Sequence, residues 1–136
     1  LTGCTGWNAS VSRTDNLTAP IPSQEMVVDN RVGNVTVEGA DVSEVAVQAT
    51  LKAYGATEND AQLLLDEMDI LLEETDGVLK VSGVYPSSFR GSVSYKIQLP
   101  HNIPVRLRTS NGAITATGIA NAVTAKTSNG KVKVMD

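Results

Sequence analysis

The sequence predicts a mostly β fold, with β-solenoid or β-helix-like coils at the C-terminal end, a strand-rich N-terminal portion and one short α-helix. Three observations support this fold class. The chain has 136 residues and is 41% hydrophobic but only 4% aromatic, so its core must consist of aliphatic side chains, many of them strand formers. Apolar and polar residues alternate along several segments. A motif of the form Gly-x-aliphatic-x-small or aliphatic-x-Gly also occurs four times, beginning at Gly33, Gly77, Gly112 and Gly130, and the last copy lacks the closing glycine.

Residues 1–25 are predicted to precede the folded domain. The chain opens with Leu1-Thr2-Gly3-Cys4, which resembles a bacterial lipobox, the short sequence that ends in a lipidated cysteine. This resemblance implies a lipid on Cys4, whose acyl chains would anchor the protein with roughly 0.8 kcal/mol per buried methylene. An ordinary exposed cysteine is the alternative. Residues 5–24 are rich in Ser, Thr, Asn and Pro and show no sustained period, so they are predicted to form a flexible tether.

Residues 26–136 are predicted to form a single β domain. In each copy of the recurring glycine motif, the third and fifth positions are apolar and the second, fourth and sixth positions are mostly polar. This alternation is typical of a strand with one buried face. Similar alternation without the glycines marks further strands, and in the last of these Arg106 and Arg108 lie on the exposed side. The predicted strands cover residues 33–39, 45–52, 77–83, 93–99, 105–109, 112–118 and 130–134.

One helix is predicted between the strands. Thr57-Glu-Asn-Asp60 has the form of a capping box with Asp in the usual Glu position, and a helix of about 10 residues is expected to follow. From Asp69 the apolar period changes to two, with Ile70 and Leu72 inward, and Asp76-Gly77 predicts a hairpin turn into the next strand. The apolar face of the helix consists of Ala61, Leu64, Leu65 and Met68.

A longer repeat joins the last two copies of the motif. Thr109-Ser110-Asn111-Gly112 returns after 18 residues as Thr127-Ser128-Asn129-Gly130, and Asn-Gly is well suited to the positive φ of a tight turn. The fixed spacing predicts successive solenoid coils, in which Asn111 and Asn129 stack about 4.8 Å apart in a turn ladder. Two unrelated Asn-Gly hairpins are the alternative. Because two coils are few for such a fold, the open end is expected to be capped, paired or continued.

The order of these parts is similar to the bacterial "putative adhesin" domain family of unknown function. The matching segments are Val35 to Gly39, the helix from Ala61 to Met68, the strand from Tyr95 to Pro100, and the two T-S-N-G coils, within residues 26 to 134. The resemblance implies an exported or membrane-tethered β-solenoid protein, often with further coils beyond Asp136. It implies no catalytic residues.

Charge and composition narrow the classes of partner and chemistry. Eleven basic and fifteen acidic residues give a net charge of −4, which argues against a nucleic-acid partner. Cys4 and His101 are single residues of their kinds, so an intramolecular disulfide and the usual zinc ligand sets are excluded, and no metal or cofactor is expected. The acidic stretch from Asp66 to Asp76 matches no EF-hand loop and is interpreted as a solvated face, with attraction of cationic ligands as the alternative.

An enzyme is not expected. Polysaccharide-cleaving solenoids need a pair of carboxylates on an outward face, whereas the outward positions of the two clearest coils are Thr115, Thr117, Lys131 and Lys133. We therefore expect a non-catalytic, extracytoplasmic lipoprotein of the bacterial cell envelope, anchored to the membrane through Cys4, with an adhesin-like binding or envelope-sensing role toward a protein or cell-surface ligand. The alternative is a structural module that forms homo-oligomers through exposed solenoid strands.

Overall fold

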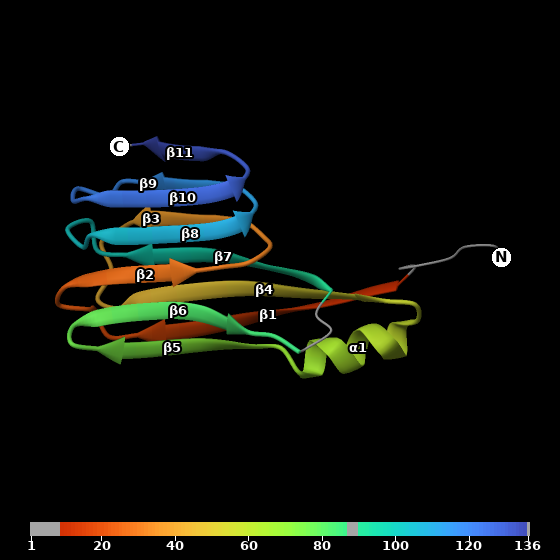
Figure 1. Cartoon of the computed structure of the whole chain (residues 1–136). Helices are drawn as coiled ribbons and strands as arrows, with labels where there is room; N and C mark the ends of the chain where they lie inside the picture. Colours follow the sequence, from red (N-terminus) through yellow and green to blue (C-terminus); the bar gives the residue numbers. More distant parts are fainter. Residues whose placement is uncertain (1–8, 87–89, 136) are drawn as a thin grey trace.

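The computed structural model of the chain describes residues 9–86 and 90–135, which form a mostly β fold with one short helix (Figure 1). This confirms the predicted mostly β class and the single short helix. The strands make two mixed sheets: sheet A with the order β1-β4-β7-β3-β9-β11, and sheet B with the order β10-β8-β2-β6-β5. The elements are β1 (Ala9–Ala19), β2 (Glu25–Asp29), β3 (Val35–Gly39), β4 (Val45–Gly55), α1 (Glu58–Asp66), β5 (Asp69–Thr75), β6 (Val78–Val84), β7 (Gly91–Leu99), β8 (Val105–Asn111), β9 (Ile114–Thr117), β10 (Val123–Asn129) and β11 (Val132–Met135).

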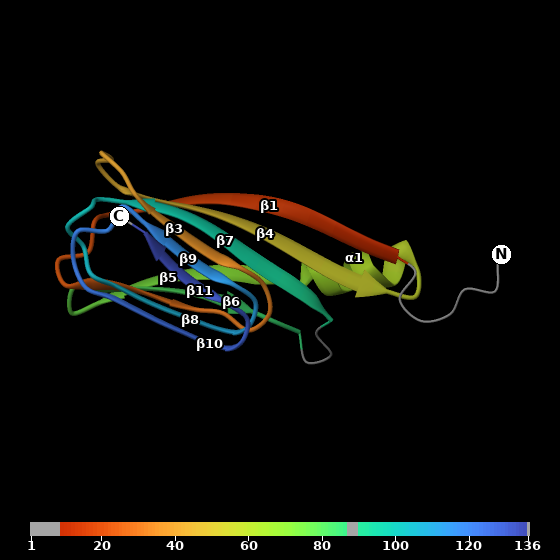
Figure 2. The ribbon, with the colours of Figure 1, turned by 90° about the horizontal axis from the view of Figure 1, so that it is seen from above.

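Three pairs of strands stack on one another, and we call each pair a level. The levels are β2 with β3, β8 with β9, and β10 with β11, and in each of them the chain passes from sheet B to sheet A. Between levels the pairing is parallel: β10 pairs with β8 and β8 with β2, while β11 pairs with β9 and β9 with β3. Seen from above, the two sheets face each other as two layers with the levels superposed (Figure 2).

The core lies between the two sheets and is aliphatic. The inward side chains of β4, β7 and β8 alternate with outward ones, as their sequences predict, and each buried aliphatic side chain contributes roughly 1.5–3 kcal/mol. Tyr95 is buried between the sheets. The largest fully buried side chains are Tyr95, Met26, Leu51, Met68, Leu79, Ile97, Leu99, Leu107 and Ile114.

Helix α1 packs against β4 and β1. The hydroxyl oxygen of Thr57 accepts a hydrogen bond from the backbone N–H of Asp60 at 3.1 Å, so the predicted N-cap is confirmed. Ala61 and Leu65 are buried against the strands, and so is Met68 just beyond the helix. Among the residues described, no helix has both the length and the apolar character needed to cross a membrane.

The hairpin between β5 and β6 also follows the sequence. Asp76 and Gly77 have φ angles of 54° and 82°, and two consecutive positive values are typical of a type I′ turn. The two strands pair in antiparallel fashion over their whole length. Ile70 is buried and Leu72 half-buried, as the change to a period of two predicts.

The prediction of a tether is wrong for residues 9–19. These residues form β1, which pairs with β4 in antiparallel fashion from Ala9 opposite Gly55 to Ala19 opposite Val45. Apolar alternation does not indicate this strand in the sequence because its half-buried side includes Arg13 and Asp15. Cys4 and the rest of residues 1–8 lie outside the described part of the chain.

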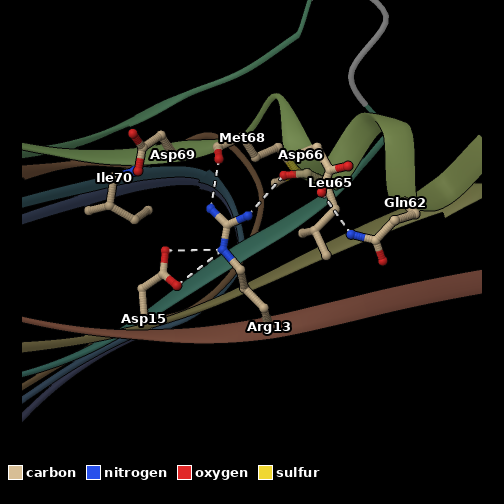
Figure 3. A network of polar contacts seen from close by, with 8 residues as sticks. All are labelled: Arg13, Asp15, Gln62, Leu65, Asp66, Met68, Asp69 and Ile70. Atoms are coloured by element: carbon tan, nitrogen blue, oxygen red, sulfur yellow. Dashed lines mark hydrogen bonds and ion pairs between the residues drawn. The ribbon is translucent and has the colours of Figure 1, made fainter.

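Arg13 fastens β1 to the end of α1 (Figure 3). Its guanidinium donates hydrogen bonds to the carbonyl oxygens of Leu65 at 3.1 Å and Met68 at 2.7 Å, and its Nε lies 3.1 Å from the carboxylate of Asp15. The last turn of α1 has no basic residue of its own. Arg13 therefore supplies both the donors and the positive charge that the carbonyl end of a helix favours.

Candidate functional site

The two T-S-N-G segments lie in register at one corner of the fold. Thr127 is aligned with Thr109, and Asn129 with Asn111, on the adjacent parallel strands β10 and β8. The side-chain amide of Asn129 donates to the amide oxygen of Asn111 at 2.9 Å. Ser110 is half-buried and Ser128 exposed, and the backbone N–H of Gly112 donates to the carbonyl of Asn129 at 2.9 Å. Direct hydrogen bonds therefore join the two segments.

Glycines form a column at the same corner because the backbones approach one another closely there. A Cβ atom on Gly130 would lie 1.9 Å from the carbonyl oxygen of Gly112, and one on Gly112 would lie 2.0 Å from that of Gly33. Gly33 stands in the same relation to Val93 of β7. The φ angles of Gly33, Gly112 and Gly130 are 132°, 146° and 156°, which favours glycine independently of space.

A third segment at this corner is not apparent in the sequence. Asn30-Arg31-Val32-Gly33 lies beneath the two T-S-N-G segments, and Val32 bridges to Asn111 in parallel. The hydroxyls of Thr127 and Thr109 donate to the carbonyls of Gly112 and Gly33 at 3.0 and 3.1 Å. Asn30 makes the equivalent bond to the carbonyl of Val93 at 2.8 Å. In this segment Asn30 and Val32 stand where the T-S-N-G segments have Thr and Asn. The only features of the sequence that relate it to them are Gly33 and the apolar alternation that follows.

The outer face of sheet A is almost entirely polar. One row of outward side chains crosses all its strands in register, and its members are Asn16, Gln48, Lys96, Thr36, Thr115 and Lys133. A second row consists of Thr18, Ala46, Gln98, Glu38, Thr117 and Met135. We call these two rows the polar face. Between β1, β4 and β7 it holds a shallow hollow of about 330 Å³ lined by Asn16, Thr18, Gln48, Lys96 and Gln98, among others.

Hydroxyl and amide groups dominate the polar face, which also carries Lys96 and Lys133, so most of its hydrogen-bond donors and acceptors are neutral. Its one carboxylate, on Glu38, accepts a hydrogen bond from the amide of Gln98 at 3.2 Å. Thr115, Thr117 and Lys133 all lie on this face, as predicted, and Lys131 is in the turn before β11. A face built in this way can hold a polar ligand but has no second carboxylate for acid-base hydrolysis.

Other titratable residues singled out in the sequence lie apart from this face. His101 is in a loop, with Nδ1 2.7 Å from the carbonyl oxygen of Gly118 and Nε2 3.5 Å from the carboxylate of Asp41. The acidic stretch from Asp66 to Asp76 runs from the end of α1 along β5, the strand at the end of sheet B, to the turn that follows. Within the described residues, no group of three or more histidine, cysteine or acidic side chains is arranged to hold a metal ion.

Tyr95 has a buried hydroxyl without a hydrogen-bond partner among the described residues. Burial raises the pKa of this hydroxyl far above its ordinary value of 10.0, with smaller effects from Tyr85 and Asp29. The unfolded chain releases this proton at lower pH than the folded chain does. The titration of the Tyr95 hydroxyl therefore does not change the free energy of unfolding below about pH 10, and the free energy of unfolding decreases as the pH rises beyond that value.

Replacing Tyr95 by Phe is expected to raise the free energy of unfolding by about 1 kcal/mol at pH 7, because the substitution removes an unsatisfied polar group from the core. It should also reduce the loss of stability above pH 10, which for one such group reaches about 1.4 kcal/mol per pH unit. Urea unfolding of both proteins at pH 7 and pH 10.5 measures the two effects. A clear destabilisation by Tyr95→Phe at pH 7 would show that the hydroxyl has a partner, such as a buried water.

The sequence matches no protein-family model, and no curated protein matches it significantly. Among solved structures, a "putative cell adhesion protein" from Clostridium sporogenes is similar over 91% of this chain and 61% of its own length, with a TM-score of 0.56 at 13% identity. A "putative adhesin" from Bacteroides fragilis is similar over 90% of this chain and 53% of its own, with a TM-score of 0.52 at 15% identity. The chain thus shares its fold with 61% and 53% of the lengths of these two bacterial proteins.

Proposed function

We propose that the protein is a non-catalytic surface-binding domain with an adhesin-like role, held outside the cytoplasmic membrane of a bacterium. The observation that carries this proposal is the polar face, which crosses every strand of sheet A and contains a hollow between β1, β4 and β7. The names of the two proteins that share the fold agree with such a role. Envelope sensing is a second form of this role, in which binding at the same face would be relayed to other components of the cell envelope.

An uncharged, hydroxyl-rich ligand suits the polar face best. Neighbouring strands place polar side chains about 4.8 Å apart, and alternate residues along one strand place them about 7 Å apart, so an extended sugar chain can meet several rows at once. Each neutral hydrogen bond contributes only about 0.5–1.5 kcal/mol. Binding by one domain is therefore weak, and many copies on one cell would bind far more tightly through multivalency.

Replacing Asn16 and Gln48 by Ala together is expected to weaken binding to a neutral polysaccharide at least tenfold, because both amides line the hollow. The measurement is retention of the protein on a panel of immobilised neutral polysaccharides. The matched control, Ser82→Ala with Thr124→Ala, removes polar groups from the outer face of sheet B and should leave retention unchanged. Absence of binding to every neutral polysaccharide, or equal losses in both variants, would contradict the proposal.

The anchor in this proposal is a lipid on Cys4, with Leu1 to Gly3 removed together with a signal peptide. Because β1 begins at Ala9, a fully extended chain reaches at most about 18 Å from Cys4 to the first strand. The domain would therefore sit close to the membrane surface. Mass spectrometry of the protein from the membrane fraction of its host tests the anchor, and an unmodified Cys4 in a soluble fraction would exclude it.

We also infer that the stacked levels are coils of a β-solenoid. The parallel register of the three levels, the glycine column and the repeated side-chain bond to the carbonyl below all support this interpretation. The turn ladder of Thr109 to Gly112 and Thr127 to Gly130 then has a structural role. It holds each corner over the corner beneath it.

A second candidate function is self-association through the level formed by β10 and β11. Both strands lie at sheet edges, and Val132, Val134 and Met135 of β11 are 45%, 53% and 40% exposed. Unpaired edges with apolar side chains favour pairing with another chain. Sedimentation velocity should show dimers of the wild type that Val134→Lys abolishes. A wild type that stays monomeric at high concentration would rule this function out.

A further inference from the structure

The charges of the chain are separated into two poles. Residues 57–76 contain eight acidic and no basic residues, whereas residues 105–135 contain five basic and no acidic residues. The first segment forms α1 and β5 at one end of the sheets, and the second forms β8 to β11 at the other end (Figure 1). The net charge of −4 therefore conceals a basic region that an anionic partner can approach.

Three of these basic side chains, together with Lys80, line one hollow on the outer face of sheet B, which is the side of the molecule opposite the polar face. We call it the basic hollow. Its volume is about 260 Å³, and the cations are Lys80 of β6, Arg106 and Arg108 of β8, and Lys126 of β10. Register explains why they meet: Lys80 and Arg106 flank Val27 on the two sides of β2, while Lys126 is directly opposite Arg108.

The cations outnumber the carboxylates that could neutralise them. Asp29, which also lines the hollow, is opposite Arg108 in the register, Glu73 is opposite Lys80, and Glu25 reaches Arg106 at 3.9 Å while the arginine stays 62% exposed. Lys126 lies on the edge strand beside Arg108, and like charges in directly opposite positions destabilise a sheet. An arrangement that keeps this repulsion in an exposed hollow is better explained by an anionic ligand than by stability.

We propose that the basic hollow binds an acidic polysaccharide, a sugar polymer with carboxylates along its length. Arginine forks bind carboxylates through two parallel hydrogen bonds, and Arg106 and Arg108 are about 7 Å apart along one strand. From Lys80 through Arg106 and Arg108 to Lys126 the cations cross the sheet diagonally, which is a path for a linear chain. Half-buried Val27 between them provides an apolar surface for a sugar ring.

A polymer fits this geometry better than a membrane does. The cations surround a recess, whereas a bilayer surface attracts basic side chains that project from a flat or convex face. This site lies on a different sheet from the polar face, so it neither requires nor excludes binding of a neutral glycan there. Either site can fail its test while the other passes.

The experiment is a titration of labelled polygalacturonate with the full chain, in which binding is measured by the fluorescence polarisation of the polymer. The wild type is expected to bind, with an affinity that falls as salt rises, and Arg106→Gln with Arg108→Gln should weaken binding at least tenfold. The control Lys52→Gln with Lys131→Gln removes two positive charges outside the hollow and should stay within about twofold of the wild type. Neutral dextran should not compete for the site.

Two further arms make the result decisive. Circular dichroism shows whether each variant is folded, and if the arginine variant is not, Lys80→Gln with Lys126→Gln replaces it with the same expected loss. Vesicles containing phosphatidylglycerol test the membrane alternative. No binding of polygalacturonate by the wild type, equal losses in the arginine and control variants, or tighter binding to vesicles than to the polymer would each overturn the proposal.

Discussion

Gly112→Val is expected to lower the free energy of unfolding by at least about 3 kcal/mol. The substituted Cβ would lie 2.0 Å from the carbonyl oxygen of Gly33, which belongs to backbone and cannot rotate away. The φ angle of 146° adds strain for any side chain. Separation of the two levels would also break the bond from the Thr109 hydroxyl to Gly33. Urea unfolding followed by circular dichroism measures the loss.

The matched control for this variant lies one level above it, at Ser128. Its side chain is exposed within the second T-S-N-G segment, so Ser128→Val should change the stability by no more than about 0.5 kcal/mol. Gly130→Val should be milder than Gly112→Val, although its Cβ contact of 1.9 Å is as short, because β10 and β11 are edge strands that can move. Equal stability of Gly112→Val and the wild type would mean that the levels do not stack as described.

The strands that the sequence predicts correctly have mostly apolar inward side chains, although β2, a short strand that also has apolar inward side chains, is not among them. In β4, Val45, Val47 and Leu51 occupy inward positions, and their period of two is visible without any knowledge of the neighbours. In β1 the inward positions include Arg13 and Asp15, which local periodicity counts as outward. Asp15 pairs with Arg13, whose other partners are in α1 and at Met68, more than fifty residues away, so no local pattern could identify β1 as a strand.

The sequence alone does not reveal the third segment of the corner or the basic hollow, and the reasons are related. Asn30 donates to a carbonyl as Thr109 and Thr127 do, but a search for repeated letters does not recognise that an amide replaces a hydroxyl. Arg106 and Arg108 were correctly predicted to be exposed. Their proximity to Lys80 and Lys126 depends on the strand order β10-β8-β2-β6, which arises from non-local pairing rather than from spacing in the chain.

Arg13 connects the part of the fold that the sequence misses to the helix that it predicts. Arg13→Ala is expected to lower the free energy of unfolding by about 2–4 kcal/mol, since it removes charged hydrogen bonds to the carbonyl of Leu65 in the last turn of α1 and to that of Met68 just beyond the helix. Because β1 is an edge strand that pairs only with β4, the loss should be concentrated there. Hydrogen exchange should therefore show that Arg13→Ala accelerates exchange, relative to the wild type, more in β1 than in β3 and β7.

Two substitutions separate the contacts of Arg13 from its charge and from its ion pair. Arg13→Lys keeps the positive charge near the end of α1 but cannot donate to both carbonyls from a planar fork, so it should lose about half as much stability as Arg13→Ala. Asp15→Asn leaves both carbonyl bonds in place and should cost less than about 1 kcal/mol, because the pair is partly exposed. If Asp15→Asn were as damaging as Arg13→Ala, the ion pair rather than the helix end would hold β1. If all three variants matched the wild type, the edge strand would be held by its ladder to β4 alone.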